Sequence, residues 1–197
     1  MNQEKTLTKL NDIKKNIDEN KTSVCVIGVG RIGLPTALSF AKSGFRTIGV
    51  DINEDLVNKI KNKKFPLKDE PGYQEIFEQV INNGKFSATT KIEEVVPNSQ
   101  IILLSLPTPM DKNNIPDYTA LRTVAKQLRN LVSTGSIIIV ESTIEPGFIE
   151  NEFIKLVESE ERQIKAGKNI GVGVCPETAN PGEIMKDFEN LPRLVAA

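Results

Sequence analysis

Three glycines placed directly after the first apolar segment restrict the possible folds more than any other feature of this chain. Residues 23–28 are rich in Val and Ile, and the turn Gly28-Val29-Gly30-Arg31-Ile32-Gly33 closes that segment. A helical pattern covers residues 32–43, and Asp51 ends the next apolar segment, roughly 20 residues beyond the first glycine. A strand, a glycine turn, a helix and an acid at this spacing predict a dinucleotide-binding βαβ unit.

Each glycine has its own reason to lack a side chain. Gly28 permits the tight turn, Gly30 lets the backbone approach a pyrophosphate, and Gly33 lets the helix pack closely on the strand. The pyrophosphate would meet free N–H groups and the positive end of the helix dipole. We expect Arg31 and Ile32 to belong to this cofactor-binding turn, although Arg31 also fits an ordinary exposed arginine.

Asp51 predicts NAD as the cofactor rather than NADP. Its carboxylate can accept hydrogen bonds from the adenosine ribose hydroxyls, and it would repel a 2′-phosphate. The following residues, Ile52 and Asn53, bring no cation to that position.

Apolar runs and amphipathic stretches alternate along the remaining chain. The runs occupy residues 23–28, 46–51, 100–106, 136–141 and 169–175, with a short one at 193–196. The helical patterns occupy residues 32–43, 54–61, 73–82, 118–132 and 146–158. Continuous apolar runs are typical of strands buried on both faces of a parallel sheet. The pattern therefore predicts an α/β fold, a doubly wound and mostly parallel Rossmann-type sheet with helices on both faces.

Composition excludes several functions. The chain has 25 basic and 26 acidic side chains, whereas nucleic-acid binding needs a basic surface. It has no histidine, which excludes Ser-His-Asp hydrolysis and His-rich zinc sites, and we expect no metal site. No apolar run approaches the ~20 residues that cross a bilayer. Two distant cysteines and a polar N-terminus favour a cytoplasmic protein.

The chain divides into residues 1–21 and a domain over residues 22–197. Leu7, Leu10, Ile13 and Ile17 fall roughly on one face of a helix in the first segment. This amphipathic extension either docks on the edge of the domain or binds a partner.

Several further motifs follow in order along the chain. They are Gly28 to Pro35, Gly49-Val50-Asp51-Ile52, Glu70-Pro71-Gly72, Pro107-Thr108-Pro109, Glu141-Ser142-Thr143, and Cys175-Pro176-Glu177 followed by Pro181-Gly182. With these motifs the chain resembles the NAD-binding domain of the UDP-glucose/GDP-mannose dehydrogenase family, and within it the UDP-N-acetylmannosamine dehydrogenases.

The resemblance implies oxidation of the C6 alcohol of a UDP-sugar to a carboxylate with two NAD in succession. A cysteine thiolate would capture the aldehyde, a second hydride transfer would give a thioester, and water would hydrolyse it. In the family that cysteine lies in a second domain, beyond a long central helix through which the parent would form a homodimer. This chain ends where the family's first domain ends, as an excised domain or a natural short product would.

The resemblance also assigns roles at two strand ends. Pro107 and Thr108 would contact the cofactor, with a rigid turn between prolines as the alternative. Ser142 and Thr143 would contact it too, with Thr143 also holding the catalytic water; plain helix-capping hydroxyls are the alternative. Glu70-Pro71-Gly72 would form a turn that shapes the rim of the site, with direct contact to a ligand as the alternative.

Glu177 matches the active-site glutamate of the family, which serves as base or water-positioner, although a surface acid in a Pro-rich loop is the alternative. Many members have Arg after this glutamate, whereas this chain has Thr178. Glu141 receives no chemical role. Cys175 directly precedes Pro176 and Glu177, but no Lys, Arg or His lies beside it in sequence, so we do not predict it as the nucleophile.

Two other functions fit the same residues. One is a free-standing NAD-binding module that senses or scaffolds without turnover. The other is a different Rossmann dehydrogenase, of the 6-phosphogluconate or 3-hydroxy acid type, in which Pro-Thr-Pro and Pro-Glu…Pro-Gly would not be expected together.

Overall fold

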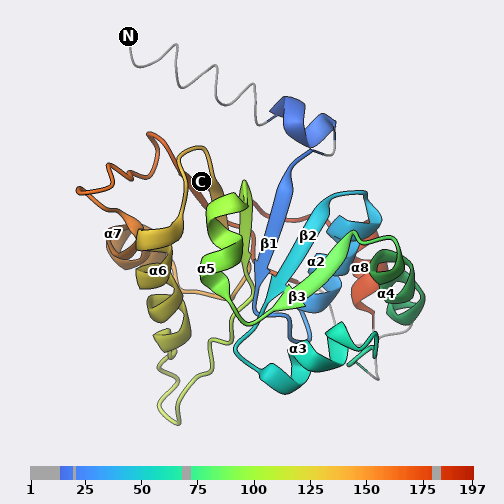
Figure 1. Cartoon of the computed structure of the whole chain (residues 1–197). Helices are drawn as coiled ribbons and strands as arrows, with labels where there is room; N and C mark the ends of the chain where they lie inside the picture. The colour runs from blue at the N-terminus through green and yellow to red at the C-terminus, as the bar shows by residue number, and fades with distance from the viewer. Residues whose placement is uncertain (1–13, 20, 68–71, 179–182) are drawn as a thin grey trace.

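Six short strands form one parallel sheet whose spatial order differs from the order of the chain (Figure 1). The computed structural model describes residues 14–19, 21–67, 72–178 and 183–197. The strands are β1 Ser23–Ile27, β2 Arg46–Val50, β3 Phe86–Thr89, β4 Ile101–Leu104, β5 Ile137–Val140 and β6 Gly171–Val174. Their order is β3-β2-β1-β4-β5-β6, and every neighbouring pair is parallel. This arrangement confirms the predicted α/β class.

The chain winds outward from β1 in both directions. It builds β2 and β3 on one side, then crosses over to place β4, β5 and β6 on the other. The carboxyl ends of β1 and β4 therefore lie side by side where the winding reverses, with Ile27 paired to Leu104. In doubly wound sheets a ligand binds outside this reversal point.

Helices cover both faces of the sheet (Figure 1). The helices α2 Gly33–Lys42, α3 Glu54–Lys61, α4 Tyr73–Asn82 and α8 Ile184–Asn190 contribute side chains to one apolar cluster. The opposite cluster is built by α5 Ile92–Val95, α6 Thr119–Leu131, the π-helix η2 Ile149–Phe153 and α7 Ile154–Val157, with the 3-10 turn η1 Val96–Asn98. Strand β1 shows why the runs lack alternation, because Val24 and Val26 enter the first cluster while Cys25 and Ile27 enter the second.

Five elements differ from the sequence-based expectations. Strand β3 and the helices α5 and α8 were not predicted, since each is short and none carries a long apolar period. The helix expected over 146–158 begins later, because Gly147 at φ 89° forms a left-handed turn before it, and its first turn is π. Residues 193–196 form no strand of the parallel sheet; they make a single antiparallel bridge between Ala196 and Val174.

The N-terminal prediction falls largely outside the described residues, which exclude Leu7, Leu10 and Ile13. Residues 14–18 are helical, and Ile17 packs, half-buried, on the cluster beneath α2. Among the described residues, no helix is long and apolar enough to cross a membrane.

Candidate functional site

The glycine turn between β1 and α2 is tightly packed at two glycines and open at the third. Gly28 has φ 88°, and a Cβ there would lie 2.5 Å from the carbonyl oxygen of Ser105. A Cβ on Gly33 would lie 1.8 Å from the carbonyl oxygen of Gly28. A Cβ on Gly30 would meet no atom within 4 Å. Protein packing therefore requires glycine at 28 and 33, whereas Gly30 borders free space.

Asp51 is held against this turn by two backbone N–H groups. Val29 N donates to Oδ2 at 2.9 Å, and Asn53 N donates to Oδ1 at 2.9 Å. The carboxylate is therefore fixed beside the glycine turn, and each oxygen keeps a lone pair for a further donor. Ile52, which follows it, is 95% exposed.

The N-terminus of α2 faces the free space at Gly30. Ile32 occupies the N-cap position of α2, with no hydrogen bond from its side chain, and Arg31 is exposed. No acidic side chain lies in the first turn. These features fit a pyrophosphate at the positive end of the helix dipole. Within the first turn, Leu34 N donates to the carbonyl oxygen of Gly30 at 3.1 Å and Pro35 has no N–H, so the dipole and the turn before the helix carry this fit.

The hydroxyls at the ends of β4 and β5 hold the two following loops together. Ser142 is buried; its Oγ donates to the carbonyl oxygen of Leu106 at 2.8 Å and accepts from Leu106 N at 3.0 Å. Thr108 Oγ1 donates to the carbonyl oxygen of Thr143 at 2.9 Å. Neither hydroxyl caps a helix in this arrangement. Pro107 and Thr143 are exposed beside them, on the carboxyl side of the sheet.

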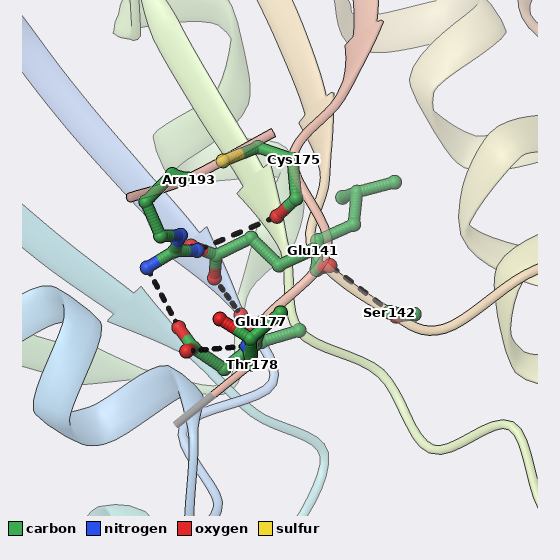
Figure 2. A network of polar contacts seen from close by, with 8 residues as sticks. Glu141, Ser142, Cys175, Glu177, Thr178 and Arg193 are labelled. Atoms are coloured by element: carbon green, nitrogen blue, oxygen red, sulfur yellow. Dashed lines mark hydrogen bonds and ion pairs between the residues drawn. The ribbon is translucent and has the colours of Figure 1, made fainter. Parts of the chain in front are cut away.

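A buried charge cluster lies beneath these loops, at the ends of β5 and β6 (Figure 2). Arg193 Nη1 lies 2.7 Å from Glu177 Oε2, and Arg193 Nη2 lies 3.6 Å from Glu141 Oε1. Ser105 Oγ hydrogen-bonds the other oxygen of Glu141. The side chains of Glu141 and Glu177 are only 3% and 7% exposed, so Glu177 is not the surface acid that the sequence allowed.

Sequence reasoning missed Glu141, Ser105 and Arg193 as members of this cluster. Of the three, Glu141 has the most strongly altered environment. Burial raises the pKa of its carboxyl above the usual range, although the hydrogen bond from Ser105 and the charge of Arg193 both lower it. An acid that ends a wholly apolar strand was the available signal, because a buried carboxylate needs a partner. Nothing in the sequence could indicate Arg193, which reaches the cluster from a segment far along the chain.

In this chain Thr178 stands where many members of the family have an arginine after the glutamate. Thr178 is exposed, and its backbone N–H donates to Glu177 Oε1 at 2.7 Å. The guanidinium beside Glu177 comes from Arg193 instead. Of the rim motif, Glu70 and Pro71 lie outside the described residues, and Gly72 is the N-cap of α4 with φ 82°.

The two cysteines differ in their surroundings. Cys25 lies in the core of β1, and burial raises the pKa of its thiol to about 12, so it is inert. Cys175 is half-buried, and Arg193 Nη2 lies 3.4 Å from its carbonyl oxygen. The folded chain thus brings a cation to a residue that has none beside it in sequence, but the contact is with the backbone.

A Rossmann-type sheet with a glycine turn open at its reversal point and an acid after β2 defines the class of dinucleotide-binding domains. Residues 22–196 match the model of the UDP-glucose/GDP-mannose dehydrogenase family, NAD binding domain, and the chain belongs to that family. Its cofactor is accordingly NAD.

Similar proteins are nucleotide-sugar dehydrogenases. The UDP-N-acetyl-D-mannosamine dehydrogenase of Methanocaldococcus jannaschii is 35% identical over 175 residues, covering 87% of this chain and 38% of that protein. The structure of the UDP-N-acetyl-mannosamine dehydrogenase of Staphylococcus aureus superimposes with a TM-score of 0.80 at 31% identity, covering 88% of this chain and 41% of that one.

A ternary complex of GDP-mannose dehydrogenase from Pseudomonas aeruginosa gives a TM-score of 0.79 at 27% identity, covering 87% of this chain and 40% of that one. The chain therefore spans about two fifths of the length of the relatives it matches.

The contrast between Gly30 and Gly33 gives a paired test of the turn. We expect Gly30→Val to abolish NAD binding while changing the free energy of unfolding by less than about 1 kcal/mol, because its side chain enters free space. Gly33→Ala should cost about 3 kcal/mol or more, since its Cβ overlaps the Gly28 carbonyl. Chemical denaturation and calorimetric titration measure the two effects. Normal NAD binding by the Gly30→Val variant would place the pyrophosphate elsewhere.

The raised pKa of Glu141 predicts a pH-dependent loss of stability. In the window above the usual glutamate pKa the folded state binds more protons than the unfolded state, so the free energy of unfolding falls as pH rises through it. Glu141→Gln cannot titrate, and we expect its stability relative to the wild type to increase from acid to neutral pH. Denaturation curves from pH 4 to 8 measure this difference. Glu150→Gln, at an exposed position, is the control; parallel curves for wild type and Glu141→Gln would refute the prediction.

Proposed function

We propose that this chain is the NAD-binding part of an oxidoreductase that converts the C6 alcohol of a UDP-sugar to the carboxylate with two NAD. The observation that carries the proposal is the continuity of the site. The open glycine turn contacts Ser105, Ser105 hydrogen-bonds Glu141, and Glu141 shares Arg193 with Glu177. The proposed cofactor cradle and the proposed catalytic acid thus belong to one connected structure.

Each residue of the proposed site has a defined part in this function. The turn at Gly28, Gly30 and Gly33 would hold the pyrophosphate, with Arg31 and Ile32 at the helix start, and Asp51 would hold the ribose. Bound NAD supplies a hydride acceptor.

Pro107, Thr108, Ser142 and Thr143 would shape the pocket beside the reacting carbon. Thr143 is the exposed hydroxyl among them and would orient a water molecule, as the resemblance implies.

Glu177 is proposed as the group that accepts a proton from that water during hydrolysis of a covalent intermediate. Its buried carboxylate is held by Arg193 and by the Thr178 N–H, so it would act from a fixed position. The nucleophilic cysteine is proposed to lie outside these 197 residues, in the part of the relatives that the chain does not span, together with the central helix of a homodimer. The relatives named UDP-N-acetyl-D-mannosamine dehydrogenases support UDP-N-acetylmannosamine as the substrate.

The position of Asp51 predicts the choice of cofactor. A carboxylate facing a 2′-phosphate is a like-charge contact. We expect NAD to bind at least ~10-fold more tightly than NADP, a difference of about 1.4 kcal/mol. Asp51→Asn should narrow this difference mainly by weakening the binding of NAD. The substitution removes the carboxylate that would bind the ribose, and it loosens the hydrogen bond from Val29 N that holds this side chain in place. Calorimetric titration with both cofactors measures it, with Asp55→Asn, an exposed acid of α3, as control. Equal affinities in the wild type would contradict the assignment.

The proposed division of the active site predicts binding without turnover. We expect this chain to bind NAD and to produce no NADH with UDP-N-acetylmannosamine, UDP-glucose or UDP-N-acetylglucosamine at high protein concentration. Absorbance of NADH follows the reaction, and a full-length relative in the same assay is the positive control. Sustained NADH production that disappears in Cys175→Ser would overturn both the division and the placement of the nucleophile.

A further inference from the structure

Arg193 joins three segments of the chain at the carboxyl edge of the sheet (Figure 2). One Nη atom is paired with Glu177 at 2.7 Å, and the other lies 3.6 Å from Glu141 and 3.4 Å from the Cys175 carbonyl oxygen. The guanidinium also lies over the ring of Phe188, 5.2 Å from its centroid. Its side chain is 24% exposed, so most of it is shielded from solvent.

The two distances from Arg193 show that Glu177 is its direct partner, whereas Glu141 is a more distant neighbour that can anchor it. Glu177 is within charge-assisted hydrogen-bond distance of Arg193, whereas Glu141 lies farther away and is tied to the sheet by Ser105. Glu141 is the more deeply buried of the two acids and directly follows the interior strand β5, so it gives the guanidinium a neighbour in a fixed position. The ring of Phe188 limits movement of the guanidinium on a further side.

The backbone at Glu177 is fixed without the arginine. Glu177 N donates to the carbonyl oxygen of Glu141 at 3.1 Å, and Cys175 N donates to that of Val140 at 2.9 Å, which continues the pairing of β5 and β6. These bonds place the main chain, but they leave the torsions of the Glu177 side chain undetermined. The guanidinium acts on that side chain, together with the Thr178 N–H at the other carboxylate oxygen.

We propose that Arg193 is a positioning residue for Glu177: anchored by Glu141, its guanidinium fixes the direction in which the Glu177 carboxylate points. The proposal rests on the proposed function, in which Glu177 acts on the hydrolytic water. Arg193 itself would touch neither cofactor nor substrate. A planar fork with several donors suits this task better than a single ammonium group, because it can hold two acceptors at set angles.

The test uses the whole 197-residue chain with 13C-labelled glutamate carboxyl groups, and Glu177→Gln assigns the Glu177 resonance. The variants are Arg193→Met, which keeps an apolar stem over Phe188, and Arg193→Lys, which keeps the charge. Arg122→Met is the matched control, because Arg122 also pairs with a glutamate, Glu152, and also lies over aromatic rings, but outside the cluster. NAD affinity is measured for each variant by calorimetric titration.

We expect Arg193→Met to move the Glu177 carboxyl resonance toward those of exposed glutamates, Arg193→Lys to restore it in part, and Arg122→Met to leave it unchanged. NAD affinity should stay within about twofold of the wild type in all three, since none of these side chains belongs to the proposed cradle. An unchanged Glu177 resonance in folded Arg193→Met would overturn the proposal. If Arg193→Met does not fold, Arg193→Lys decides in its place: an unshifted Glu177 resonance there would also overturn it, since lysine loses the fork.

Failure of the proposed function is separable from failure of this proposal. A wild-type chain that binds no NAD would refute the function, while the Glu177 resonance is recorded without cofactor and still reports on Arg193. Glu141→Gln adds an independent check of the anchor. It should shift the Glu177 resonance in the same direction as Arg193→Met, and an unchanged resonance would refute the anchoring role of Glu141.

Discussion

The close approach of α2 to the end of β1 is the contact on which the rest of the site depends. Because a side chain at Gly33 would overlap the Gly28 carbonyl, the helix can begin directly above the strand only if both positions are glycine. That approach aims the first turn of α2 at the free space beside Gly30 and brings Val29 within hydrogen-bond distance of Asp51. The geometry of the proposed cradle follows from one backbone contact.

Strand pairing in the sheet connects the glycine turn to the buried charge cluster. Strands β1 and β4 are in register at Ile27 and Leu104, so Ser105 meets the glycine turn directly after β4 ends. Ser105 then contacts Glu141 at the end of β5. Parallel pairing thus places polar residues that follow separate apolar strands side by side. Because they are buried, they form hydrogen bonds and ion pairs with one another in place of water.

Local patterns predicted the elements that carry long apolar periods or special glycines. The bounds of α3 and α4 agree with the predicted ranges, and α2 and α6 agree within one residue at each end. The apolar pattern does not predict strand β3, because its four residues include Ser87 and Thr89 and its place at the sheet edge depends on pairing with β2. The helix expected from residue 146 begins later because Gly147 adopts a left-handed conformation that the apolar pattern does not show.

By itself the sequence determined the class of fold, the glycine turn and the acid after β2, because these depend on backbone conformation and on spacing within one βαβ unit. Only the tertiary structure decided how the buried charges are arranged. Arg193 reaches Glu177 from a segment that sequence periodicity describes as a strand. Its other acidic neighbour, Glu141, is a residue to which the sequence assigns no chemical role. Pairing between distant segments is set by packing of the whole sheet, and no local pattern encodes it.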